Sequence, residues 1–321
     1  MAKAPSIEDQ LAQLAAIGKS PDTTETRAQL RKNLGSKSSV IVAKTADIIA
    51  GIENHEFASD LMTAFQRFMR EPAKTDKGCA AKTAIVKALL ATDCDDEQVF
   101  RTGVRHVQLE PVWGGRADTA APLRALCALG LVQTGSPDAM IELATLLADP
   151  EPDARIGAAH ALAHCGHIAV PLLRFKVLSG DSELSVLSEC LNGLVKIAPA
   201  ASLEFVGGFI DPASPLYESA AFALAESRIP EVFALLHEKW TGTFDREFKQ
   251  ILLLPIALTR SDAACDFLIS LLETGDVAIS TAVIKALSIY RGDAMIRKRA
   301  EEAICGQAEA QLRSLLRREF D

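Results

Sequence analysis

Aromatic residues are scarce in this sequence. Phenylalanine, tryptophan and tyrosine together make up 5% of the 321 residues, with only two tryptophans and two tyrosines. Strands are enriched in aromatic and β-branched side chains, whereas the dominant apolar residues here, alanine and leucine, are strong helix formers. The composition therefore argues against a β-rich fold and predicts an all-α protein.

The sequence also shows no CxxC motif, no evident signal peptide and no long apolar run. Its seven cysteines are dispersed without a CxxC, so we expect small buried residues in a reducing compartment and no disulfide framework. The start, MAKAPSIEDQ, has no apolar region of a signal peptide. The longest strongly apolar run, residues 251–258, is too short to span a bilayer. We therefore expect a cytoplasmic protein without a membrane span.

Positive charge is sparse in the later part of the chain. Residues 134–290 carry 10 Lys/Arg against 20 Asp/Glu, whereas residues 1–133 carry 17 against 16. Phosphate contacts need clustered Lys/Arg, so a nucleic-acid surface is not expected in this region. The acidity fits a basic or mixed-charge protein partner, or solubility alone.

What the sequence does contain is an internal repeat. Residues 149–163 read DPEPDARIGAAHALA, and residues 211–225 read DPASPLYESAAFALA. A leucine or isoleucine at the position of Leu162 recurs at intervals of 40, 40, 33, 32, 30, 34 and 29 residues, which is typical of stacked helical hairpins. These predicted anchors are Ile49, Leu89, Leu129, Leu162, Leu194, Leu224, Leu258 and Leu287. Aspartates in the turns between repeats are expected to N-cap the next helix, namely Asp149, Asp181, Asp211 and Asp276.

The repeat predicts an all-α α-solenoid of about eight stacked helical hairpins. A capping-box pattern, Ser6 with Asp9, predicts a first helix, and a second is expected over residues 24–34. Residues 1–112 then form capping helices and degenerate repeats. Residues 113–321 form regular repeats of the same continuous solenoid. One long charged helix, residues 291–318, is expected to cap its end.

The Asp-Pro turns, the Ala-Leu pairs and the period of about 30 residues resemble the HEAT-repeat superfamily. The shorter periods look most like bacterial HEAT-like repeats of the phycobilisome-lyase type, whose unit reads Asp-Pro-x-x-x-Val-Arg-x-x-Ala-Ala-x-Ala-Leu-Gly. Residues 149–162 match it with Ala154 in place of Val, and residues 211–224 match with Tyr217 in place of Arg. The resemblance covers roughly residues 36–308. It implies a HEAT-like or armadillo-like fold, and it leaves function open because this scaffold serves scaffolding, transport and a few enzymatic roles.

A histidine cluster is the clearest local group that could bind a metal. His160 and His164 are spaced i, i+4 on one predicted helix, a spacing that can bind zinc, with Cys165 and His167 at the helix end. Asn192 and Phe222 take the place of His160 in other repeats, which favours an outward, variable position. We therefore expect no bound metal and no cofactor.

The sequence does not contain the motifs of known enzymes that are built on this scaffold. HEAT-like di-iron hydroxylases carry repeated His-Glu pairs in equivalent helices, but here such pairs occur only at His55 and His237, in unequal places. Helical-repeat DNA glycosylases use a basic groove with aromatics and a catalytic aspartate, which an acidic repeat face does not supply. We therefore predict a non-enzymatic scaffold or adaptor that binds protein on the concave face. The alternative is a ligand-handling, phycobilin-lyase-like protein acting with a partner subunit.

The loop EPVWGGR, residues 110–116, is the best candidate for a specific site. An aromatic residue in a Gly-flanked loop beside an arginine, here Trp113 and Arg116, has the composition of an interface hot spot. The opposing interpretation is that Trp113 folds back over the ends of neighbouring helices. Trp240 ends a predicted second helix and is expected to pack there.

Overall fold

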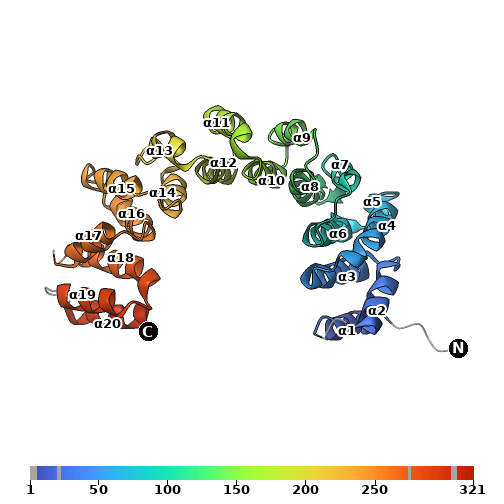
Figure 1. Cartoon of the computed structure of the whole chain (residues 1–321), viewed down its shortest axis with the longest axis horizontal. Coiled ribbons are helices and arrows are strands. Elements are labelled where there is room, and N and C mark those ends of the chain that lie inside the picture. The colour runs from blue at the N-terminus through green and yellow to red at the C-terminus, as the bar shows by residue number, and fades with distance from the viewer. Residues whose placement is uncertain (1–5, 20–22, 274–275, 305–308) are drawn as a thin grey trace. The chain divides into compact units, whose positions relative to one another are not determined.

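The computed structural model describes residues 6–19, 23–273, 276–304 and 309–321. Across these ranges it contains twenty α-helices and one β-hairpin (Figure 1). The chain divides into two compact units, Met1–Cys165 (unit 1) and Gly166–Asp321 (unit 2). Consecutive helices pack as stacked hairpins within each unit, so the predicted fold class, an all-α α-solenoid of helical hairpins, is confirmed.

Unit 1 contains ten α-helices, two short 3-10 helices and the hairpin. In chain order these elements are α1 Ile7–Ile17, α2 Thr24–Leu34, α3 Ser39–Ile52, η1 His55–Phe57, α4 Ala58–Phe68, α5 Pro72–Thr75, η2 Lys77–Cys79, α6 Ala80–Ala91, α7 Glu97–Gly103, β1 Leu109–Val112, β2 Gly115–Asp118, α8 Ala121–Gln133, α9 Ala139–Leu146 and α10 Pro152–Leu162.

Unit 2 contains helices and their connecting turns, and no strand, among the residues that the structure describes. Its elements are η3 Gly166–Ala169, α11 Val170–Ser179, α12 Leu184–Ile197, α13 Pro199–Gly207, α14 Tyr217–Glu226, α15 Glu231–Thr241, α16 Arg246–Leu258, α17 Asp262–Leu272, α18 Val277–Leu287, η4 Ser288–Tyr290, α19 Ala294–Ala303 and α20 Glu309–Phe320. No helix in the described ranges is both long and apolar enough to cross a membrane.

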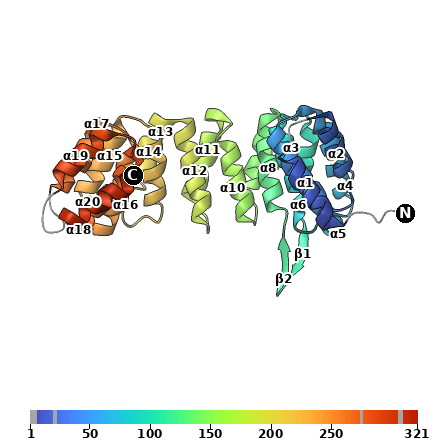
Figure 2. The same cartoon turned by 90° about the horizontal axis from the view of Figure 1, so that it is seen from below.

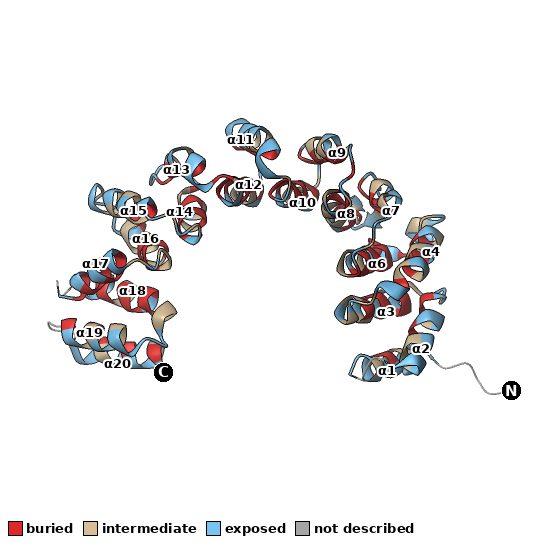
Figure 3. Cartoon of the chain, in the orientation of Figure 1, coloured by how far each residue is buried: buried red, intermediate tan, exposed pale blue. Residues whose placement is uncertain are grey.

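Each unit has two rows of helices. In unit 1, α1, α3, α6, α8 and α10 pack against one another in sequence, and α2, α4, α7 and α9 lie against them (Figure 1). In unit 2, α12, α14, α16, α18 and α20 form the corresponding row. We call the members of these two rows the first helices. Buried residues concentrate where the first helices meet each other and the second row, because no single hairpin can bury both of its faces (Figure 3).

The two helices expected at the start of the chain are confirmed. In α1 the backbone N–H of Asp9 donates to Ser6 Oγ at 3.1 Å, and the N–H of Ser6 donates to the Asp9 carboxylate at 3.0 Å. Thr23 and Thr26 make the same reciprocal pair at the start of α2, which covers the predicted residues 24–34. Local capping chemistry therefore determines where these helices begin.

Six of the eight predicted anchors are fully buried, and two are in the wrong register. Leu129 and Leu258 are only half-buried. The equivalents of Leu162 in their helices are Leu131 and Ile256, both 0% exposed. The residues one, three and four positions before Leu131 and before Ile256 are also buried, as they are before Leu162 in α10. With these two corrections, the six anchors from Leu131 onward stand 31, 32, 30, 32 and 31 residues apart. Alanine and leucine alternate in α8, so sequence alone could not distinguish adjacent registers.

The turn aspartates cap their helices less uniformly than predicted. Asp276 is an N-cap, accepting from the backbone N–H groups of the second and third following residues at 3.0 and 3.1 Å. Asp149, Asp181 and Asp211 instead accept from the N–H two residues later, before their helices start. These three aspartates therefore fold the turn itself, as Asx-turn residues.

The single long helix predicted for residues 291–318 is two helices. Helix α19 ends at Ala303, and Ile304 follows with extended backbone angles (φ −66°, ψ 118°) and a side chain that is 2% exposed. Helix α20 begins at Glu309 and buries Leu312, Leu316 and Phe320. The backbone therefore leaves the helical conformation at Ile304, whose side chain is buried. The division expected at 112/113 falls inside unit 1, within the hairpin, and stays a prediction.

Candidate partner-binding site

The loop singled out in the sequence is a β-hairpin, not an irregular loop. Strand β1 (Leu109–Val112) pairs antiparallel with β2 (Gly115–Asp118), with Val112 opposite Gly115. The hairpin stands between α7 and α8 and projects away from the helices of unit 1 (Figure 2). The prediction from composition did not include these strands, because each is only four residues long.

A tight turn of Trp113 and Gly114 joins the strands. Gly114 has φ +88°, whereas Trp113 is not among the residues with positive φ. A positive φ at the second central residue is the requirement of a type II turn, and glycine meets it without a steric penalty. The sequence Trp-Gly therefore places the tryptophan at the outermost point of the ribbon.

Trp113 is 103% exposed, so its indole touches no other part of the described chain to any appreciable extent. The interpretation that Trp113 covers the ends of neighbouring helices is therefore wrong. The flanking apolar residues are exposed as well, with Leu109 at 46% and Val112 at 50%. Large apolar side chains gathered in solvent typically mark interaction sites.

Arg116 lies on one face of the ribbon with Leu109 and Pro111. Residues two apart on a strand share a face, and Arg116 stands directly opposite Pro111. Arg116 is exposed, and its Nη2 donates to the carbonyl oxygen of Leu109 at 3.4 Å. The two predicted candidates, Trp113 and Arg116, are thus brought together on one hairpin and both face solvent.

The base of the hairpin, unlike its tip, is held by buried charges. Asp118 ends β2, and its Oδ2 accepts from Arg124 Nη1 at 2.6 Å. Its Oδ1 accepts from the backbone N–H groups of Gln108 and Ala120, both at 2.9 Å. Burial raises the pKa of Asp118, but these hydrogen bonds and the guanidinium outweigh it, so the pKa lies below the usual range. Because Asp118 is paired with Arg124, its carboxylate is not free to act on a substrate.

Arg124 is 2% exposed and joins the hairpin to the next repeat. Its Nε and Nη2 donate to the two carboxylate oxygens of Asp149 at 2.9 and 2.8 Å, and its Nη1 also donates to the carbonyl of His106 at 2.8 Å. Burial lowers the pKa of Arg124, but Asp149 and Asp118 raise it by more. A planar guanidinium suits this arrangement, because it can bind one carboxylate in bidentate fashion while still reaching a second.

The β1 side of the base is tied to the start of α6. Glu110 Oε1 accepts from the backbone N–H of Gly78 at 2.7 Å and from Gln108 Nε2 at 2.5 Å. The hydrogen bond from Gln108, with further ones from Gly78 and Thr119, holds the pKa of Glu110 below its usual value. Gln108 Nε2 also donates to the carbonyl of Asp76 at 2.7 Å. Both strands are therefore anchored, and only the distal turn lacks support.

The same buried cation recurs in three consecutive first helices. Lys82, Arg124 and Arg155 each stand seven residues before an anchor and six residues after an aspartate. Lys82 Nζ pairs with Asp76 at 2.9 Å, both fully buried, and Arg155 Nη1 donates to the carbonyl of Asp149 at 2.8 Å. The hairpin is therefore inserted in the turn between two repeats and ends at that turn's own aspartate, Asp118. The Asp-x5-Lys/Arg spacing at this position is visible in the sequence, although it also occurs at Asp95 and Asp293.

The structure places His160 on α10 and His164 just after its end. The rings of His160 and His164 lie 5.3 Å apart between centroids, and both residues are exposed. Cys165 is half-buried, with Sγ 3.5 Å from the carbonyl oxygen of Ala161. Among the described residues, no group of three or more His, Cys, Asp or Glu side chains is placed to hold a metal ion.

Two further expectations from the sequence concern Trp240 and the cysteines. Trp240 packs edge-on against Phe267 at 5.1 Å between ring centroids, and its Nε1 donates to the carbonyl of Lys249 at 3.1 Å, as expected for a packing residue. Four of the six cysteines in the described ranges are buried and two are half-buried. Burial raises the pKa of Cys79 to about 11 and of Cys190 to about 12, so neither supplies a reactive thiolate near neutral pH.

Comparison with known proteins gives little further information. No protein-family model and no curated protein matches the sequence. The solved structures with a similar chain include "The structure of the complex of CpcE and CpcF of phycocyanin lyase from Nostoc sp. PCC7120". The two chains are 16% identical, with a TM-score of 0.35, over 94% of this chain and 96% of that chain. A likeness at this level says nothing about what this chain binds.

Proposed function

We propose that this protein is a non-enzymatic, HEAT-like scaffold that captures a protein partner with the tip of its β-hairpin. Trp113 is the hot-spot residue of this site, and Arg116 contributes hydrogen bonds and charge beside it. The exposed face of the first helices provides additional contact surface. A scaffold of this kind acts by holding its partner, so no catalytic group or cofactor belongs to the proposal.

The observation that carries the proposal is the complete exposure of Trp113 on a hairpin whose base is fixed. Burying an indole removes on the order of 150–250 Å² from water, which is roughly 4–6 kcal/mol before the costs of association. Because the base is already held, little conformational entropy is lost when the tip is bound. A rigid aromatic side chain beside an arginine is the typical composition of an interface hot spot.

Charge indicates the kind of partner. Residues 134–290 carry twice as many acidic as basic residues, whereas the hairpin presents Arg116. A basic partner would match the acidic region, and a partner of mixed charge would match both regions. The alternative, a lyase-type protein that handles a ligand together with a partner subunit, would require a deep pocket with convergent polar groups. Four hollows of about 310–440 Å³ on the described part of the chain are open to solvent, which favours the scaffold.

Affinity capture from the native host, followed by mass spectrometry, tests the proposal when wild type is compared with two variants. Trp113→Ala should lose the captured partner, whereas Phe244→Ala should retain it. Phe244 is the matched control, because it is an aromatic residue that is 102% exposed on another loop. With the partner then purified, Trp113→Ala should weaken binding by about 30-fold or more, the loss typical of a hot spot.

The proposal fails if the same proteins are captured equally by wild type and Trp113→Ala. The fold of the variant is checked by circular dichroism and thermal unfolding, and its stability should change by less than about 0.5 kcal/mol because the side chain makes no packing contact. A large loss of stability would mean that the tryptophan has a structural role.

A further inference from the structure

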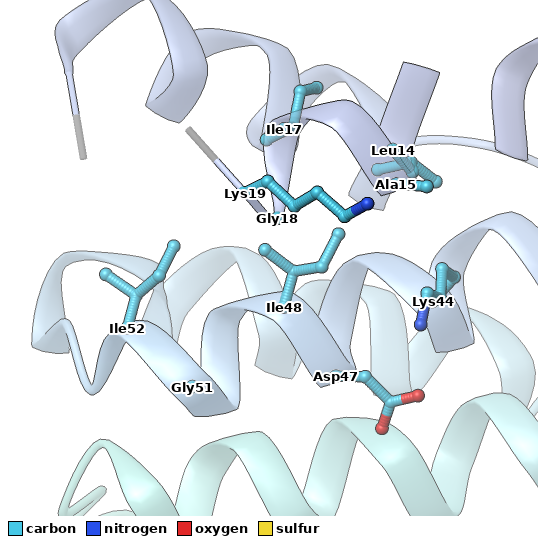
Figure 4. A pocket seen from close by; sticks show the side chains of 10 residues that line it. All are labelled: Leu14, Ala15, Ile17, Gly18, Lys19, Lys44, Asp47, Ile48, Gly51 and Ile52. Carbon is cyan, nitrogen blue, oxygen red and sulfur yellow. The ribbon is translucent and has the colours of Figure 1, made fainter. Parts of the chain in front are cut away.

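Two adjoining hollows lie on the first helices of unit 1. The first, about 440 Å³, lies between α1 and α3 (Figure 4). The second, about 350 Å³, lies between α3, α6 and the start of α8. Asp47 lines both hollows, so they meet on the exposed side of α3. Together they form one groove that crosses α1, α3 and α6 and reaches the start of α8.

The floor of this groove is aliphatic and its edges carry lysines. Ile48 and Ile52 of α3 are half-buried in the first hollow, and alanine side chains of α3 and α6 line the second. Lys19, which follows the end of α1, extends across the first hollow, and Lys44 of α3 also lines it (Figure 4). Lys87 of α6 lines the second. We call this surface the lysine groove.

The lysines of the groove hold uncompensated charge. Lys19, Lys44 and Lys87 are exposed, and none has an ion pair within the part of the chain that the structure describes. Lys82, also on α6, differs because it is buried and paired with Asp76. Asp47 is the one carboxylate among the residues that line the two hollows. Three positive charges therefore face one negative charge over an apolar floor.

We propose that the lysine groove binds an extended acidic segment of a partner protein. Aliphatic side chains of the segment contact the isoleucine and alanine floor, and its carboxylates pair with Lys19, Lys44 and Lys87. Neighbouring helices lie about 8–10 Å apart, so crossing from α1 to α6 spans roughly 20 Å. An extended chain covers this distance with about six residues, at about 3.3 Å each. The lysine groove is separate from the hairpin tip, and the inference goes beyond the hairpin proposal.

The test uses fluorescence anisotropy with a labelled peptide of about eight residues that alternates glutamate and leucine, a length slightly above the span of the groove. The comparison peptide alternates lysine and leucine. The acidic peptide should bind the full-length protein, and its affinity should fall as salt is raised, because exposed charges are screened. The lysine peptide should bind at least about tenfold more weakly, since like charges repel at the edges of the groove.

Variants locate the binding. Replacing Lys44 and Lys87 together by glutamate should weaken the acidic peptide by about tenfold or more, because two ion pairs are lost and two repulsions appear. Lys285→Glu is the matched control, since Lys285 is an exposed lysine on first helix α18, in unit 2, and its variant should bind as wild type does. Trp113→Ala should also bind the acidic peptide unchanged, so failure of the groove proposal is distinguishable from failure of the hairpin proposal.

Three results would overturn the inference. The first is equal binding of the acidic peptide by wild type and the double lysine variant. The second is equally tight competition by a single-stranded oligouridylate, which would make the groove a general anion surface. The third is self-association of the wild type that the double variant abolishes, which would assign the groove to a second copy of the chain. Circular dichroism of each variant confirms that these surface changes leave the helices intact.

Discussion

Asp118, the last residue of β2, binds Arg124 on α8 through an oxygen and a nitrogen 2.6 Å apart, and the two residues stand six positions apart in the sequence. The same six-residue separation joins Asp76 to Lys82 one repeat earlier. An ion pair of the repeat therefore serves as the base of the hairpin that carries Trp113. The exposed tip and the buried scaffold are connected through this pair, and the predictions below begin from it.

Arg124→Ala should destabilise unit 1 strongly. The change leaves the carboxylates of Asp118 and Asp149 buried without their cation, and breaking a buried pair in this way costs about 3–5 kcal/mol. Urea unfolding followed by circular dichroism measures the loss. Arg246→Ala is the control, because the Arg246–Asp276 pair is largely exposed and should contribute less than about 1 kcal/mol. Similar losses for the two variants would show that the Arg124 network is not effectively buried.

The Asp118 carboxylate should make stability depend on acid pH. Its pKa in the folded state lies below the unfolded value, so its contribution is present above the unfolded pKa and is lost as pH falls through the folded one. The stability difference between wild type and Asp118→Asn should therefore be largest near neutral pH and shrink below about pH 4. Thermal unfolding across this range provides the measurement. A constant difference between pH 7 and pH 3 would contradict the assignment.

The corrected register of α8 can be tested with three leucine variants. Leu131→Ala and Leu162→Ala should each cost about 2–5 kcal/mol, because both side chains are completely buried. Leu129→Ala should cost only about 1 kcal/mol, since Leu129 is half-buried. Denaturant unfolding of the three proteins gives the comparison. If Leu129→Ala were the most damaging of the three, the register of the helix would be the one predicted from sequence.

Helices α8 and α10 pack closely at Gly157. A Cβ added there would lie 2.2 Å from the Cβ and 2.4 Å from the Cα of Ala125, which cannot rotate away. Gly157→Ala should therefore destabilise the protein by about 1–3 kcal/mol. Gly51→Ala is the matched control in a helix with open space around the added atom, and it should be neutral or stabilising by up to about 1 kcal/mol. The melting temperature should fall for Gly157→Ala and should stay the same or rise for Gly51→Ala.

The sequence alone predicted features set by local chemistry or by repetition. The capping pair of Ser6 and Asp9 places the start of α1, because the interacting groups are three residues apart. The Ala-Leu pairs and the period of about 30 residues predicted stacked hairpins, since every repeat must bury the same face. Trp113 and Arg116 were singled out because they interrupt the repeat.

The tertiary structure decided what depends on contacts between distant residues. Whether Leu129 or Leu131 faces the core depends on which neighbours fill the space beside α8, and both registers look alike along the chain. The network around Arg124 includes the pairing of Arg124 with Asp149, 25 positions away in the sequence. The exposure of Trp113 follows from this base, because an anchored hairpin cannot fold back onto the helices. The sequence by itself therefore determined the repeat, whereas the tertiary structure decided which of its interruptions presents a surface to solvent.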